Sequence, residues 1–83
     1  MTRSCAAAEG GRSRILEADI ALQLARDGEK RVAKLSASGS ASTVEASRTA
    51  ADALRLAAVR DGLVAETWRT EIAARMRSAE RNA

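Results

Sequence analysis

Side chains that build compact cores are scarce in this chain of 83 residues, in which Trp68 is the only aromatic residue and Phe and Tyr are absent. Aromatic side chains normally contribute much of the area buried in cores and interfaces. The apolar fraction is 46%, but much of it is alanine, which favours helices and buries little area. A chain this short also buries a smaller share of its surface than a larger domain. We therefore expect one domain with a thin core.

Histidine is absent and Cys5 is the only cysteine, which excludes an intrachain disulfide and a zinc site of thiolates and imidazoles. The sequence also lacks a glycine-rich phosphate loop and a strand that could carry a nucleophile. We predict no catalytic residue, no metal and no cofactor. The first residues lack the apolar core of a signal peptide, and no run is long enough to span a bilayer, so we expect a cytoplasmic protein without membrane contact.

Proline is absent and glycine occurs five times, so few positions enforce a break in a helix. Apolar residues recur at spacings of three and four in two segments, at about 13–36 and 43–80. The small, polar residues 36–42 between them are typical of a turn between helices. The sequence therefore predicts an all-α fold: an antiparallel helical hairpin of two long helices, the second of them longer.

Two features refine the ends of the expected helices. Ser42 or Thr43 can cap the second helix, and with Ser42 as the cap Glu45 takes the third helical position, as a capping box requires. Residues 1–12 carry no apolar periodicity, which predicts a flexible N-terminal arm ahead of a hairpin at 13–83. In the alternative, this arm folds back as a short N-terminal helix. Whether Gly28 and Gly62 bend the two helices stays open.

Folding about the turn sets Leu35 near Val44, Leu24 near Leu54 to Leu56, Ile20 near Val59, and Leu16 near Leu63. At about 1.5 Å per residue the first helix is about 35 Å long and the second about 55 Å, so the second must overhang its partner. The overhang carries Trp68, Ile72 and Met76, spaced four residues apart. We expect these three side chains to anchor a partner.

Both predicted helices also carry apolar residues away from the expected contact between them. These are Ile15 and Leu22 on the first helix, and Leu56, Val59 and Leu63 on the second. A helix that is apolar on more than one side is usually buried on more than one side. In a two-helix protein the extra burial must come from another chain, either a second copy or a larger helical partner. We therefore predict a hetero- or homo-oligomer.

The net charge of +3 and the sequence pI near 10.0 raise nucleic-acid binding as a less favoured alternative. Four arginines lie in the last turns of the second helix, namely Arg69, Arg75, Arg77 and Arg81. Glutamates are interleaved with them, and no recognition module or stacking aromatic accompanies them. The charge pattern favours solubility more than a specific ligand.

The segment 16–20, the Gly/Ser turn, and a longer helix with Ala53-Leu54 and Val59 resemble the small type III secretion co-chaperones of the YscE kind, over residues 14–72. Those proteins are helical hairpins that join a tetratricopeptide-repeat chaperone and keep a needle subunit soluble before export. The resemblance implies a non-catalytic adaptor or co-chaperone that docks its apolar faces on a helical partner. The arginine-rich extension with Trp68 departs from that compact pattern. The alternative is a self-associating helical-bundle structural protein.

Overall fold

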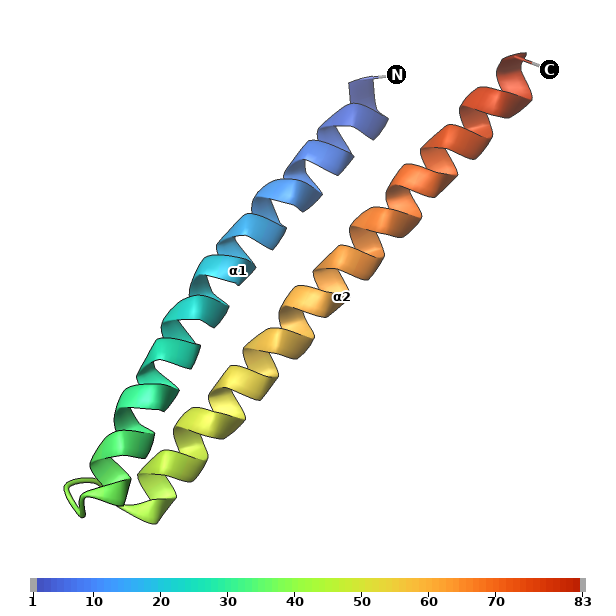
Figure 1. The fold of residues 1–83 in the computed structure, drawn as a ribbon. Coiled ribbons are helices and arrows are strands. Elements are labelled where there is room, and N and C mark those ends of the chain that lie inside the picture. The colour runs from blue at the N-terminus through green and yellow to red at the C-terminus, as the bar shows by residue number, and fades with distance from the viewer. Residues whose placement is uncertain (1, 83) are drawn as a thin grey trace.

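The computed structural model describes residues 2–82, and the side chains of residues 9–82. Two helices, α1 (Thr2–Ala37) and α2 (Thr43–Asn82), lie side by side and run antiparallel (Figure 1). Together they form a narrow rod measuring 66 × 14 × 12 Å. The predicted all-α hairpin, with a longer second helix, is therefore confirmed.

The N-terminal part of α1 differs from the expectation. The helix begins at Thr2 rather than near residue 13, so residues 2–12 continue α1 and replace both the expected arm and a folded-back helix. Alanine favours helix strongly, and the alanines at 6–8 extend α1 along α2. Both helices run unbroken through Gly28 and Gly62. Met1 and Ala83, which belong to the expected segments, lie outside the described residues.

The longer α1 removes most of the predicted overhang. The helices contain 36 and 40 residues, and both termini lie at the same end of the rod (Figure 1). The segment of α2 from Trp68 to Met76 therefore lies alongside the first turns of α1. Side chains in this segment are therefore exposed only where they point away from α1, because α1 lies beside the segment.

The turn between the helices is held by hydrogen bonds at both ends. Gly39 has a φ of 82°, its N–H donates to the Ser36 carbonyl at 3.1 Å, and the Ser40 N–H donates to the Leu35 carbonyl at 2.7 Å. This pair of bonds is the Schellman motif that ends many helices at a glycine. On the other side, Ser42 Oγ accepts from the Glu45 N–H at 3.0 Å, which confirms Ser42 as the cap of α2.

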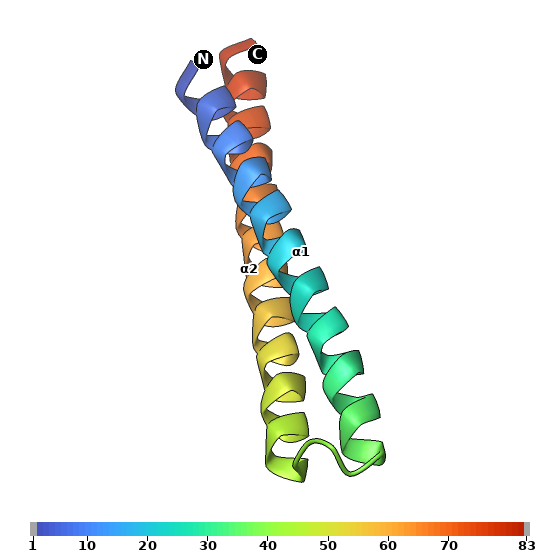
Figure 2. The same cartoon turned by 90° about the vertical axis from the view of Figure 1, so that its left-hand side faces the viewer.

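Ion pairs between the helices fix which residues lie level with each other. Arg60 Nε donates to Asp19 Oδ1 at 2.8 Å, and Arg12 Nη2 donates to Glu71 Oε1 at 2.8 Å. Residues 19 and 60 are therefore level, which agrees with the predicted pairing of Ile20 with Val59. The helices cross at a shallow angle along their length (Figure 2).

Small side chains dominate the line of contact between α1 and α2, which we call the seam. Its buried residues are Gly11, Leu22 and Ala53, the last two 6% exposed, and Thr67, 9% exposed. Seam positions alternate between spacings of three and four, the repeat of a left-handed coiled coil. On α1 they are Gly11, Ile15, Ala18, Leu22, Ala25, Glu29, Val32 and Ser36; on α2 they are Ala46, Thr49, Ala53, Leu56, Arg60, Leu63, Thr67, Thr70 and Ala74.

The rotation of each helix about its own axis differs from the expectation. Leu16, Ile20 and Leu24, which were expected to face α2, are 62%, 56% and 67% exposed, and Leu54 is 73% exposed. Small residues at the seam let the two backbones approach closely. A Cβ built on Gly11 would lie only 3.2 Å from Thr67 Cβ. Larger side chains at most seam positions would hold the helices apart, so bulky residues lie outside.

Candidate functional site

Four of the predicted partner-binding residues lie in the seam: Ile15, Leu22, Leu56 and Leu63. Leu22 is buried and the other three are half-buried. Leu63 lines a small cleft between the helices together with residues of α1 that include Gly11 and Arg14. The expectation that these four side chains point away from the contact between the helices is wrong, because they fill the space between the smaller seam residues.

The other predicted residues remain accessible on α2. Trp68 is 59% exposed, Met76 is 64% exposed, Val59 is 47% exposed and Ile72 is half-buried. Ile72 is two residues from each of the seam residues Thr70 and Ala74, which is slightly more than half a turn of helix. Trp68, Ile72 and Met76, which we call the α2 stripe, therefore lie on the side of α2 that faces away from α1.

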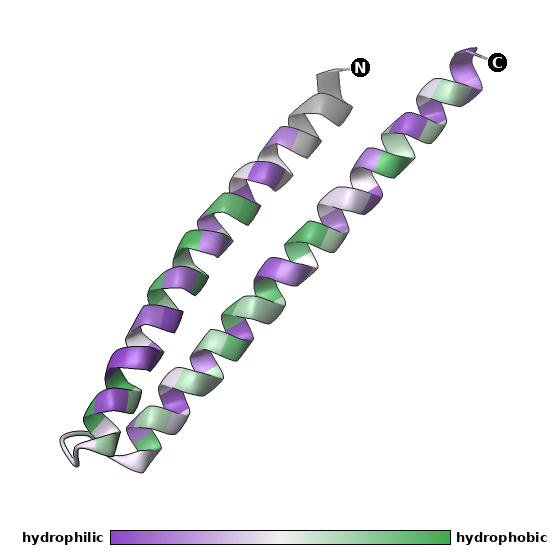
Figure 3. Cartoon of the chain, viewed as in Figure 1, coloured by the Kyte–Doolittle hydropathy of each residue, from purple (hydrophilic) through white to green (hydrophobic). Residues whose placement is uncertain are grey.

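A matching group on α1 was missed by the sequence analysis. Leu16, Ile20 and Leu24, which we call the α1 stripe, have the same spacing of four and are all more than half exposed. Ile20 is two residues from each of the seam residues Ala18 and Leu22, so this stripe also faces outward. The two stripes lie on opposite edges of the hairpin. The hydropathy of both helices is mixed over the coloured residues of the rod (Figure 3).

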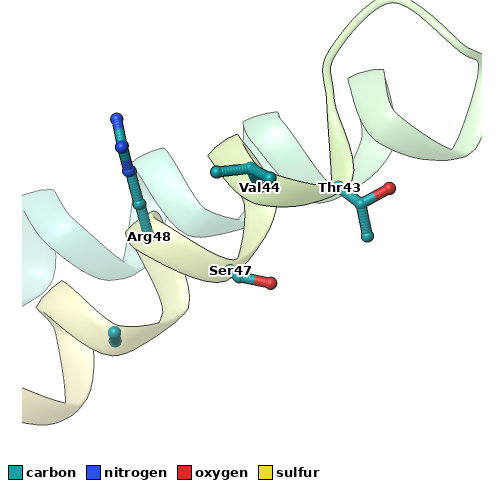
Figure 4. A pocket seen from close by; sticks show the side chains of 5 residues that line it. Thr43, Val44, Ser47 and Arg48 are labelled. Atoms are coloured by element: carbon teal, nitrogen blue, oxygen red, sulfur yellow. The ribbon is translucent and has the colours of Figure 1, made fainter.

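The outer side of α2 carries a longer apolar line in addition to the α2 stripe. Every seventh residue along it is alanine or larger and apolar: Val44, Ala51, Ala58, Ala65, Ile72 and Ala79. Leu54 lies beside this line and is 73% exposed. Where α2 begins, Thr43, Val44, Ser47, Arg48 and Ala51 line a shallow hollow (Figure 4). The outside of α2 thus carries one apolar position in each seven residues, whereas a complete coiled-coil contact carries two.

Charges beside the two stripes have opposite signs. Residues 15–25 contain Glu17 and Asp19 and no basic residue, whereas residues 67–77 contain three arginines and Glu71. Asp19 and Glu71 are already paired within the hairpin, with Arg60 and Arg12. Among the described side chains, Glu17, Arg69 and Arg75 take part in no ion pair. The unpaired charge directly beside the α1 stripe is therefore negative, with Arg14 and Arg26 just beyond the two ends of residues 15–25, and the charge beside the α2 stripe is positive.

Arg60, Asp19 and Asp61 form a cluster of charged side chains at the middle of the seam, and this cluster links the two helices. Arg60 Nη1 donates to Asp61 Oδ1 at 3.2 Å, in addition to the bond from Nε to Asp19. These hydrogen bonds, first to Asp61 and then to Asp19, raise the pKa of the Arg60 guanidinium. Arg60 thus connects Asp19 of α1 with Asp61 of α2 at the level where residues 19 and 60 meet.

The described residues contain no group of three or more His, Cys, Asp or Glu that could hold a metal ion. Neither α1 nor α2, over the part described, combines the length and the hydropathy needed to cross a membrane. Comparison with protein-family models, with curated proteins and with solved structures found no match to this chain.

Proposed function

We propose that this hairpin is a non-catalytic protein-binding adaptor that docks a helix of another chain on the outer side of α2. The observation that carries the proposal is the exposed α2 stripe, in which Trp68 and Met76 are 59% and 64% exposed. Tryptophan is the residue type most enriched among the side chains that dominate binding energy. The only aromatic residue of the chain lies there.

The repeat of the outer surface favours a helix as the bound element. Apolar residues recur there every seven positions from Val44 to Ala79, with Leu54 and Trp68 between them. Apolar residues on one side of a long helix, spread over several turns, favour a second helix over an extended peptide or a loop as the bound element. The seam already holds α1, so a partner helix on the outer side leaves the hairpin intact.

The resemblance to small type III secretion co-chaperones supports the same mode of action. In that interpretation the partner is a helical chaperone, and the hairpin serves as its co-chaperone in the cytoplasm. The apolar outer side of α2 is then covered in the complex. The arginines beside the α2 stripe favour a partner surface with acidic residues.

The test is site-specific photo-crosslinking in the host cell, with a crosslinking amino acid at Trp68 and, as control, at the exposed Ala33. A partner that docks on α2 is captured at residue 68 and not at 33. The captured protein is then purified and titrated with the full-length hairpin. Replacing Trp68 by alanine should weaken binding by about 30-fold or more, the effect of a hot-spot residue.

The matched control is Ala33→Gln, which changes an exposed residue away from both stripes and should leave the affinity unchanged. Circular dichroism of both variants confirms that the helices are retained. Equal affinity of the Trp68→Ala variant and the unaltered chain would remove the α2 stripe as the docking surface.

A further inference from the structure

The two outward stripes fit each other in length and in chemistry. Each presents three apolar side chains at spacings of four, so each extends over about 12 Å of helix. The α1 stripe has Glu17 beside Leu16, and the α2 stripe has Arg69 beside Trp68 and Arg75 beside Met76. None of these charged groups has an ion-pair partner among the described side chains. The α1 stripe therefore has an unpaired carboxylate beside it, and the α2 stripe has unpaired guanidinium groups beside it.

We propose that a second copy of this chain docks its α1 stripe on the α2 stripe of the first. This inference rests on the proposed function, since it names a partner for the same surface. Charge complementarity selects the pairing. Two α2 stripes would bring arginines together, and two α1 stripes would bring Glu17 close to its own copy. Only the pairing of α1 with α2 sets opposite charges beside a shared apolar contact.

Positive charge lies toward both ends of the α2 stripe, so either helix direction places it near Glu17. Arg69 and Arg75 each lie three residues from Ile72, one on either side of it, and Glu17 lies three residues before Ile20. If Ile20 contacts Ile72, Glu17 is on the same flank of the contact as Arg75 when the helices run parallel and as Arg69 when they run antiparallel, about six residues away along the helix axis. The charges therefore attract across the rim of the contact in either arrangement, without a direct ion pair between residues at one level.

The placement of the stripes on opposite edges determines the kind of assembly. A copy that donates its α1 stripe to one neighbour still presents its own α2 stripe to another. The contact is therefore heterologous, and copies add one after another until a ring closes or a filament forms. A closed dimer requires the same surface on both copies, which the charges disfavour.

Two neutral substitutions separate the stripes experimentally. Ile20→Gln blocks the α1 stripe and Trp68→Gln blocks the α2 stripe, and both keep the net charge and a good helix-forming residue. Sedimentation is measured from about 10 μM to 1 mM, the range of weak association. We expect the unaltered chain to grow beyond a dimer, each variant alone to be monomeric, and their equimolar mixture to form a dimer.

Tryptophan fluorescence gives an independent signal from the same mixture. The Trp68→Gln variant has no tryptophan, so all emission comes from the intact α2 stripe of the Ile20→Gln variant. Its emission should shift to shorter wavelength only when the second variant is added. Ala33→Gln, added to the unaltered chain, is the control and should leave its assembly unchanged.

The charge pairing has its own test in the mixture. Glu17→Arg placed on the Trp68→Gln chain lies in the contact and should weaken the dimer at least several-fold. The same change on the Ile20→Gln chain lies outside the contact and should leave the dimer unaffected. Equal effects on the two chains would overturn the pairing of α1 with α2.

Other outcomes overturn the inference in distinguishable ways. A dimer of the Ile20→Gln variant alone means that α2 pairs with α2, and a dimer of the Trp68→Gln variant alone means that α1 pairs with α1. An unaltered chain that stays monomeric up to 1 mM excludes self-assembly. In that case the photo-crosslinking experiment at residue 68 still tests the proposed function, because it can capture a partner that is a different protein.

Discussion

Gly10 and Gly11 are neighbours in α1 with different surroundings. A Cβ on Gly10 meets nothing within 4 Å, whereas a Cβ on Gly11 would collide with the Thr67 side chain. Gly10→Ala should therefore raise the free energy of unfolding by about 0.5–1 kcal/mol through helix propensity. Gly11→Ala should be about 1–3 kcal/mol less stable than Gly10→Ala, because it overpacks the seam. Urea unfolding followed by circular dichroism measures both.

A second substitution tests whether the collision with Thr67 causes the lower stability expected of Gly11→Ala. In the Gly11→Ala background, Thr67→Ala removes the hydroxyl and methyl groups that the new Cβ would meet, and should recover part of the loss. Two alanine variants of equal stability would show that the helices can separate at this level without cost, contrary to the close approach at Gly11.

The ion pair of Asp19 with Arg60 is the polar contact whose strength can be measured most directly. Its side chains are 45% and 40% exposed, so solvent screens the attraction and the coupling should be only about 0.2–1 kcal/mol. A double-mutant cycle with Asp19→Asn and Arg60→Gln measures that coupling. A coupling of several kcal/mol would indicate a contact shielded from water, which the exposure contradicts.

At the scale of the elements, the turn depends on Gly39. Its φ of 82° is strained for any residue with a side chain, although a Cβ there would meet nothing within 4 Å. Gly39→Ala should therefore cost about 1–2 kcal/mol from backbone conformation alone. Thermal unfolding, compared with Gly10→Ala, measures it, since both glycines are open but only one has a positive φ. A stabilising Gly39→Ala change would contradict the Schellman geometry.

The turn, the cap and the level of the helices could be predicted because they depend on local chemistry. The Gly/Ser segment ends one helix, Ser42 starts the next, and a short turn fixes which residues are level. The rotation of the helices could not be predicted by the same means. Leucine and isoleucine occur on both sides of α1, so their presence does not identify the side that faces α2.

Small residues alone do not identify the seam. Ala18 and Ala25 on α1, and Ala46 and Ala53 on α2, recur at a spacing of seven in the seam, but Ala51, Ala58 and Ala65 recur at the same spacing on the outer side of α2. Burial of large apolar residues is favourable, but two backbones that approach closely gain contact along their whole length. The expectation that the α1 stripe faces α2 rests on the first effect alone.

The candidate surface was predicted in part. The exposure of Trp68 and Met76 agrees with the expectation, because residues at spacings of four on a long helix share a side, and Val59 is also exposed. The reason for that exposure was wrong, since α1 extends to Thr2 and lies alongside them. The side chains of the α2 stripe are accessible because they point away from α1. The length of α1 could not be inferred from apolar periodicity that residues 1–12 lack.

At the scale of the whole molecule, the shape itself can be tested. The hairpin has a radius of gyration of 18.9 Å, whereas a compact globular domain of the same length would have about 12 Å. Small-angle X-ray scattering, extrapolated to zero concentration, should give a value near 19 Å. A value near 12 Å would mean that the chain folds into a shorter bundle, and a value near 28 Å that it is unfolded.

Most seam residues are small, and most large apolar residues lie outside the seam, which has a consequence for sequence change. The side chains that hold the hairpin together and the exposed apolar side chains occupy different positions. Substitutions at Leu16, Leu54 or Trp68 should change the exposed surface while the two helices stay together. The hairpin is therefore suited to redesign in which residues at its outer positions are replaced and the fold is kept.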